Sequence, residues 1–105
     1  MTVYIKENSF WAGLASRKLK SKRMAITLGN TIHLRHTSTA DFLKNKKWVC
    51  HELAHVRQFQ RYGQLTFLLM YVWESAKKGY HNNKWEVEAR AAERDLSVLD
   101  DVTFI

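Results

Sequence analysis

The chain has 105 residues, which is enough for one domain with a modest core and too few for two domains. Hydrophobic residues make up 46% of it and aromatic residues 12%, so an intrinsically disordered chain is excluded. The net charge of +7 would suit an anionic partner. However, no aromatic side chains interleave with the two basic runs, Arg17–Arg23 and Lys44–Lys47, as a surface for stacking bases would require. We therefore expect these runs to be solvated helix ends and loops, and we expect no nucleic-acid site.

The first predicted elements are a helix and a hairpin. Apolar residues of the segment 9–20 (SFWAGLASRKLK) fall near one helical stripe, and Ser9 is a suitable N-cap. Residues 24–28 (MAITL) and 31–35 (TIHLR) are β-prone and flank Gly29-Asn30, a dipeptide that suits a two-residue hairpin turn. This hairpin is the only strong strand signal in the chain.

The chain after Ser38 is predicted to be helical, with Ser38 or Thr39 as the first N-cap and Asp41 in the first turn. Three further helices are expected from glycine and N-cap positions: about Lys46 to Tyr62 before Gly63, about Gln64 to Lys78 before Gly79, and from Asn83 to about Leu99. The fold class is therefore α+β, a single domain over residues 1–105 in which a short hairpin or sheet precedes a mostly helical body.

The pentapeptide HELAH, residues 51–55, is an H-E-x-x-H pattern on a predicted helix. Residues four apart lie on one helix face, so His51 and His55 can both reach one tetrahedral zinc ion. Glu52 lies one step around the helix, where its carboxylate flanks the metal without binding it. We therefore expect Glu52 to act as a general base that takes a proton from the metal-activated water.

A catalytic zinc site needs a third protein ligand, which we expect from the last predicted helix. Its buried stripe is predicted from five apolar residues at helical spacing: Trp85, Ala89, Ala92, Leu96 and Leu99. Glu88 lies on or beside that stripe, whereas Glu86 falls on an expected solvent face with Arg90 and Glu93. Glu88 is therefore the predicted ligand and Glu86 the alternative; a buried salt bridge of Glu88 with Arg57 or Arg94 is the competing interpretation.

Three segments together resemble the extracellular contractile injection system core domain, a small zincin-like family. They are MAITLGNTIHLR, CHELAHVRQ and EVEARAAE, in which the family pattern falls on Thr27, Gly29 and Ile32, on His51 to Gln58, and on Glu88-Ala89. The wider similarity is to gluzincin metallopeptidases, in which a glutamate from a later helix completes the site. The resemblance extends over about Ala12 to Asp95.

This resemblance implies a minimal zincin-like fold with one zinc ion per chain. By this resemblance, His51, His55 and Glu88 are the expected zinc ligands and Glu52 is the expected general base. The resemblance also implies a peptide or protein substrate. The sequence departs from the family at Cys50, where a small residue is usual.

Other side chains are weaker candidates for the site. Tyr80 or His81, which precede the last helix, could stabilise an oxyanion. Gln58 could form a hydrogen bond within the site or simply pack, and Asp95 could orient a zinc-bound imidazole or lie on the helix surface. Strand alternation predicts that His33 is exposed.

Cys50 is the only cysteine, so no intramolecular disulfide can form, and its direction on the helix indicates a packed thiol. No signal peptide is apparent at the N-terminus, so we expect a cytoplasmic protein, although export by a dedicated machine would leave no signal of this kind. The longest apolar stretch, Leu65–Trp73, is too short to span a bilayer. It is expected to form core or the wall of a substrate cleft, with a protein partner or membrane surface as the alternative.

Three functions compete at this stage. The first is zinc-dependent hydrolysis of a peptide bond, with Glu52 as the base. The second is a non-catalytic zinc-binding structural or interaction module, which would have no need of Glu52. The third, a basic binder of nucleic acid or membrane surface, is supported by charge alone.

Overall fold

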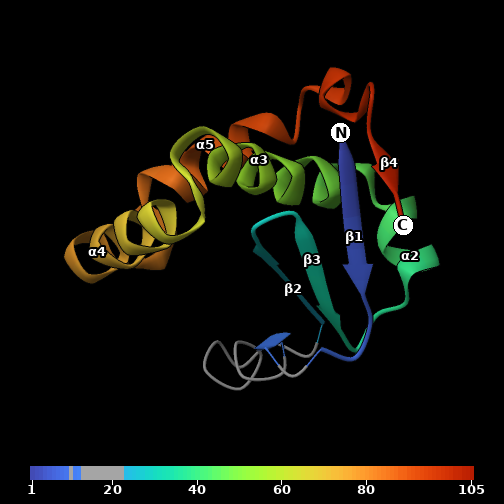
Figure 1. Ribbon diagram of the computed structural model, residues 1–105, viewed down its shortest axis with the longest axis horizontal. Coiled ribbons are helices and arrows are strands. Elements are labelled where there is room, and N and C mark those ends of the chain that lie inside the picture. Colours follow the sequence, from blue (N-terminus) through green and yellow to red (C-terminus); the bar gives the residue numbers. More distant parts are fainter. Residues whose placement is uncertain (10, 13–22) are drawn as a thin grey trace.

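The computed structural model describes residues 1–9, 11–12 and 23–105 and has the expected α+β fold (Figure 1). The helix predicted over residues 9–20 lies largely outside the described residues. The described elements, in chain order, are β1 (Thr2–Lys6), β2 (Met24–Leu28), β3 (Thr31–Arg35), α2 (Thr39–Lys44), α3 (Lys46–Tyr62), α4 (Gln64–Asn82), α5 (Lys84–Ala92), the 3-10 helix η1 (Leu96–Leu99) and β4 (Thr103–Phe104).

The sheet has the strand order β2-β3-β1-β4. The predicted hairpin is confirmed: β2 and β3 pair antiparallel, and Gly29 adopts a φ of 66° in the turn, a conformation that glycine tolerates well. The sequence did not reveal β1 and β4, which pair parallel with β3 and β1 respectively. Strand β2 is left at the edge of the sheet, next to the helices that carry the candidate site (Figure 1).

Helix α3 lies across the sheet and supplies one side of the main core. Ile32 and Leu34 of β3 pack with Val49, Leu53 and Val56 of α3, and all five are essentially fully buried. The boundaries predicted for this helix are confirmed. His51 and His55 lie outside this core cluster, on the part of α3 that packs near α4 and α5.

A second cluster of Phe59, Phe67 and Trp85 joins α3, α4 and α5. The expected break at Gly79 appears as a kink within α4, where this glycine adopts a φ of 78°. None of the helices in the described part of the chain is both long and apolar enough to cross a membrane.

The last helix differs from the prediction. Asn83 is its N-cap, as expected, but α5 ends at Ala92 and is followed by turns and by η1. Leu96 is 57% exposed and does not continue a buried stripe. The expectation of one helix to Leu99 is therefore wrong, and this error displaces the predicted inner face of α5.

His33 was predicted to be exposed, and this prediction is also wrong. Its side chain is buried, and its Nδ1 lies 2.8 Å from the Oγ of Ser9. Ile32, His33 and Leu34 are buried in succession along β3, so both faces of the sheet are covered at this point and alternation does not expose His33.

Candidate metal centre

Helix α3 brings the two motif histidines together. Asn45 caps the helix by accepting a hydrogen bond from the Trp48 amide, and the turns that follow place His51 and His55 one above the other. Their ring centroids are 5.1 Å apart, and His55 is buried while His51 is nearly so. The helical spacing therefore produces the paired imidazoles that the motif predicts.

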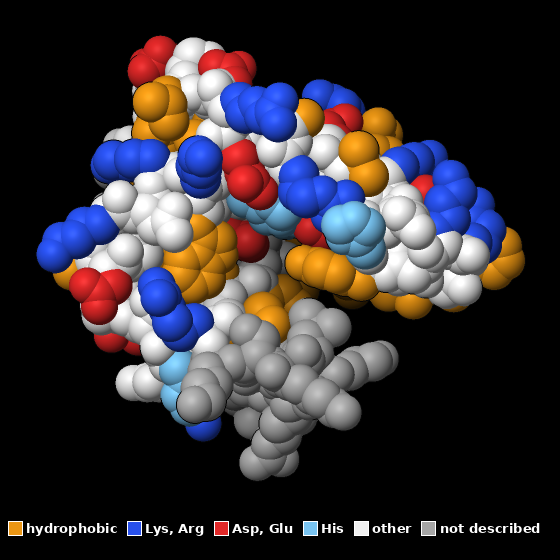
Figure 2. Space-filling view, turned by 180° about the vertical axis from the view of Figure 1, so that it is seen from behind, with side chains coloured by type: hydrophobic (Ala, Val, Ile, Leu, Met, Phe, Trp, Pro, Cys, Tyr) orange, Lys and Arg blue, Asp and Glu red, His pale blue; other side chains and the backbone are white. Residues whose placement is uncertain are grey.

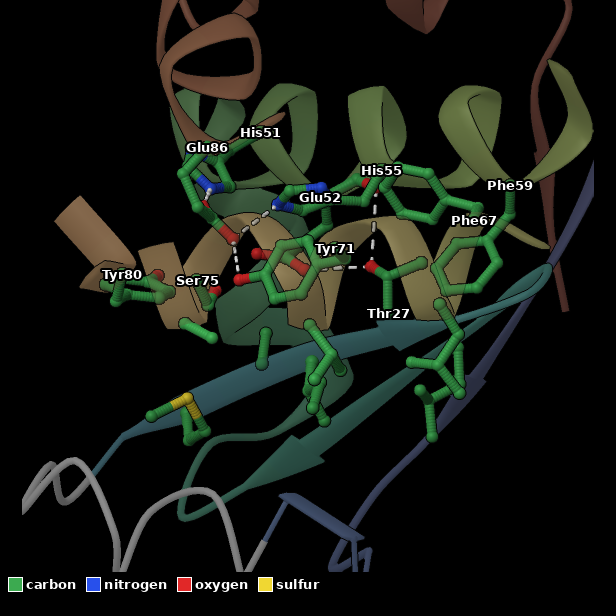
Figure 3. A pocket seen from close by; sticks show the side chains of 17 residues that line it. Thr27, His51, Glu52, His55, Phe59, Phe67, Tyr71, Ser75, Tyr80 and Glu86 are labelled. Carbon is green, nitrogen blue, oxygen red and sulfur yellow. Dashed lines mark hydrogen bonds and ion pairs between the residues drawn. The ribbon is translucent and has the colours of Figure 1, made fainter. Parts of the chain in front are cut away.

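Glu86 of α5 completes a cluster with these histidines (Figure 3). Its Oε1 lies 2.9 Å from Nε2 of His51, and its Oε2 lies 3.1 Å from Nε2 of His55. One ligand atom from each of the three residues can be chosen so that all lie within 4.8 Å of one another. Two imidazole nitrogens and one carboxylate oxygen form a donor set that suits zinc, so these residues could hold such an ion.

The structure corrects the assignment of faces on α5. Glu86 is only 3% exposed, whereas Glu88 is exposed and accepts a hydrogen bond from Nε2 of Gln58. The competing salt bridge with Arg57 or Arg94 is not among the described ion pairs, and Arg57 donates to the Val98 carbonyl. The buried residues of α5 are Trp85, Glu86 and Ala89, and the helix ends at Ala92, before the Leu96 and Leu99 positions from which the inner face was predicted.

A second set of contacts holds the imidazole rings from behind. Nδ1 of His51 lies 2.7 Å from Oε2 of Glu93, and Nδ1 of His55 lies 2.8 Å from Oε1 of Gln58. An Nδ1–H that donates to each of these oxygens directs Nε2 toward the centre of the cluster. Sequence reasoning had assigned Glu93 to solvent; Asp95, the carboxylate considered for this role, instead caps η1 by accepting from the Ser97 amide.

Glu52 lies in the same cavity but outside the three-residue cluster. Its side chain is 5% exposed, and its Oε1 accepts a 2.8 Å hydrogen bond from Oγ1 of Thr27 on β2. Burial raises the pKa of Glu52, although the nearby histidines oppose that shift. The position of Thr27 in the T-x-G-x-x-I pattern was the only sequence signal that could have indicated this contact.

Two tyrosines from α4 face the cluster. The hydroxyl of Tyr71 donates a 2.5 Å hydrogen bond to Oε2 of Glu86, a contact that the sequence did not predict. Tyr80 lines the cavity, and burial together with the charge of Glu86 raises its pKa to about 12. His81, the other candidate from that segment, is exposed and is not among the described cavity-lining residues.

The charged state of the metal-free cluster follows from these contacts. Burial alone would lower the pKa of His51, but its hydrogen bond to Glu86 and the other carboxylates raise that pKa to about 9. Burial alone would raise the pKa of Glu86, but hydrogen bonds from His51 and His55 hold it well below its usual value. Without metal, the cluster is therefore an ion-paired network of protonated imidazole and carboxylate.

The cluster lies at one end of a cavity of about 620 Å³ between α3, α4 and β2 (Figure 3). Leu68 and Val72 from the apolar segment Leu65–Trp73 line it, together with residues of the β2 edge strand. This places part of the segment in the cleft wall, one of the positions expected for it. Cys50 is buried, as expected for a packed thiol.

Fold and site together define a small α+β domain with a His-His-Glu cluster that could hold a metal ion. Residues 12–63, just under half of the chain, match the family model of the eCIS core domain. This match supports the family relationship indicated by the sequence motifs. It includes the hairpin and the HELAH helix and ends before α4 and α5. No curated protein and no solved structure matches the chain.

Proposed function

We propose that this protein is a zinc-dependent peptidase-type hydrolase in which His51, His55 and Glu86 hold the metal. The position of Glu52 supports this proposal most strongly: a buried carboxylate faces the same cavity as the three ligand atoms and is oriented by Thr27 instead of joining them. A purely structural metal site needs no such group.

His51, His55 and Glu86 would hold the zinc ion, which would supply a Lewis acid for a carbonyl group and for water. Glu52 then accepts a proton from water and passes it to the leaving amine. Tyr80, whose raised pKa keeps its hydroxyl protonated, donates a hydrogen bond to the oxygen on which negative charge develops. Tyr71 holds Glu86 in place through the hydroxyl contact.

The test compares three glutamates by the same Glu→Gln change. Glu86→Gln should lose zinc, Glu52→Gln should keep zinc and lose hydrolysis by about 10²–10⁴-fold, and Glu88→Gln, the exposed control, should keep both. Metal analysis gives the zinc content, which should be close to one per chain in the parent, and a fluorogenic peptide library gives turnover. Cleavage by Glu52→Gln at the parental rate would rule out the proposed base.

A non-catalytic metal-binding module within a protein assembly is the second candidate. The match to the eCIS core domain and the exposed apolar side chains of α4 favour it, since both suit a protein partner. This candidate predicts a parent that binds zinc, is stabilised by it and cleaves no library peptide. Glu52→Gln would then bind as much zinc as the parent, and neither protein would cleave the library.

A further inference from the structure

Helix α4 buries little of its surface. Of its 19 residues, only Phe67 and Glu74 are buried. By contrast, Leu65 is 70% exposed, Leu69 61% and Trp73 66%. These three side chains are four residues apart, so they form one row along the helix, which we call the outer row of α4. Single exposed apolar side chains are ordinary, but a contiguous row of large ones marks an interaction surface.

The outer row is separate from the cleft that contains the metal centre. Leu69 and Trp73 line neither the large cavity nor a smaller one of about 350 Å³ at the start of α4. Only Leu65 borders the smaller cavity, and the wall of the large one is formed by other α4 side chains such as Leu68 and Val72. A ligand in the cleft would therefore not cover the outer row.

Positive charge lies at the C-terminal end of the outer row. Lys77 follows Trp73 by four residues, and its Nζ lies 5.8 Å from the centre of the Trp73 ring. Lys78 and Lys84 are also exposed at this end of the helix. Glu74, the only acidic residue of α4, is buried and lies 3.6 Å from Nζ of Lys77 and 3.5 Å from Nζ of Lys78. The exposed side chains of α4 are therefore apolar, neutral or cationic.

An anionic membrane surface matches this combination. In Figure 2, Lys and Arg side chains gather at the end of the molecule where α4 meets α5, and hydrophobic side chains lie along the edge next to them. Leucine and tryptophan favour the boundary between lipid headgroups and acyl chains, and lysine reaches from there to the headgroups. The net charge of +7 also attracts the molecule to an anionic bilayer. A protein partner would cover apolar side chains too, but cations without an exposed carboxylate favour a uniformly anionic surface.

We propose that the outer row of α4 docks this protein on anionic lipid bilayers. Leu65, Leu69 and Trp73 enter the bilayer below the headgroups, and Lys77 and Lys78 lie at the level of the headgroup phosphates. Helix α4 then lies in the plane of the interface. This inference goes beyond the proposed function and does not depend on it, because none of these side chains belongs to the metal cluster.

The test is co-sedimentation of the full chain with vesicles of phosphatidylcholine alone or of an equal mixture of phosphatidylcholine and phosphatidylglycerol. Binding should be strong only to the anionic vesicles and should weaken as salt is added. Leu69→Glu should lower the partition coefficient by at least about 10-fold. Leu96→Glu is the matched control, because Leu96 is 57% exposed on η1, and it should bind within about 2-fold of the parent. Thermal unfolding should show that both variants fold as the parent does.

Two further variants separate insertion from general electrostatic attraction. Lys77→Gln should weaken binding to anionic vesicles by about 5-fold, whereas Lys47→Gln, which removes an exposed charge from α3, should change it less than about 2-fold. Anionic vesicles should shift the tryptophan emission of the parent to the blue. Trp73→Phe keeps an aromatic ring, so it should still bind and lose most of that shift.

Equal binding to neutral and anionic vesicles, equal effects of Leu69→Glu and Leu96→Glu, or a full blue shift in Trp73→Phe would overturn the proposal. No vesicle binding at all would overturn it as well and would leave a protein partner as the occupant of the outer row. Sedimentation without vesicles that shows a dimer dissociated by Leu69→Glu would make a second copy the occupant. Peptide cleavage, or its absence, does not enter these measurements, so this proposal and the proposed function fail separately.

Discussion

Each imidazole of the cluster is held at both ring nitrogens. Nδ1 of His51 faces Glu93, Nδ1 of His55 faces Gln58, and both Nε2 atoms face Glu86. Such contacts fix the orientation of a ligand ring before metal arrives and increase its basicity. The affinity of the site therefore depends on residues that do not touch the metal themselves.

Glu93→Gln should weaken zinc binding by about 10–100-fold, because the amide keeps the size of the side chain but removes the charge that supports His51. Competition with a chromogenic chelator measures the change. Asp95→Asn is the control: it alters the carboxylate that sequence reasoning had considered for this role, and asparagine still caps η1. An affinity equal to the parent's in Glu93→Gln would show that the 2.7 Å contact does not support the ligand.

At the scale of elements, the junction between α4 and α5 positions the third ligand. Asn83 is fully buried and accepts a 2.8 Å hydrogen bond from the Trp85 amide, which starts α5. Its Nδ2 donates to the Tyr71 carbonyl at 3.1 Å and to Oγ of Ser75 at 2.8 Å, which ties the start of α5 to α4. Glu86 lies in the first turn after this junction, so the cap also sets the place of the ligand.

Asn83→Ala should lower the free energy of unfolding by at least about 2 kcal/mol, since it removes a cap and leaves buried polar partners unsatisfied. Asn45, the N-cap of α3, is exposed, so Asn45→Ala should lower the free energy of unfolding by only about 1 kcal/mol. Urea unfolding of both variants in the presence of a chelator measures the difference. Equal losses would mean that the contacts of Asn83 to α4 add nothing.

Sequence reasoning succeeded where local signals decide the structure. The caps Ser38 and Asn83, the boundaries of α3 and the Gly29-Asn30 hairpin all depend on near neighbours in the chain. Strands β1 and β4 were missed because they are stabilised by pairing with distant segments.

The choice between Glu86 and Glu88 depended on how far α5 extends. The predicted inner face relied on Leu96 and Leu99, which lie beyond the end of α5 at Ala92; within the helix, Glu86 is buried and Glu88 is exposed. For the same reason, Glu93 was placed on the wrong face, although it contacts His51.

For the whole molecule, the electrostatic state of the metal-free site should control stability as pH changes. The folded pKa of His51 is raised from 6.5 to about 9, so this residue stabilises the fold fully below pH 6.5 and loses that effect as pH rises through 9. The pKa of Glu86 is lowered, so its contribution is present above pH 4.5 and is lost as pH falls.

We therefore expect the free energy of unfolding of the chelated protein to fall between pH 6.5 and 9, with up to about 3 kcal/mol of the loss from His51. Saturating zinc should reverse the trend, because metal binds the deprotonated ligands more readily at higher pH. Thermal or urea unfolding with and without zinc measures both slopes. In Glu86→Gln, the fall should be smaller; an unchanged slope would contradict the assigned ion pair.

The net charge of +7 should give only weak, salt-sensitive association with nucleic acid. Electrophoretic or anisotropy assays with DNA and RNA should show binding at low ionic strength that disappears at physiological salt. Binding that survives physiological salt would indicate a specific site and contradict this expectation.

The metal cluster takes two ligands from α3 and one from α5, with the whole of α4 between them in the chain. A zinc ion there would act as a removable crosslink that closes the loop containing α4. Chelation would open that loop and leave α4 and α5 held by the Phe59, Phe67 and Trp85 cluster and the Asn83 contacts. The concentration of free zinc would then determine how strongly α4 and α5 resist proteolysis, independently of any reaction in the cleft.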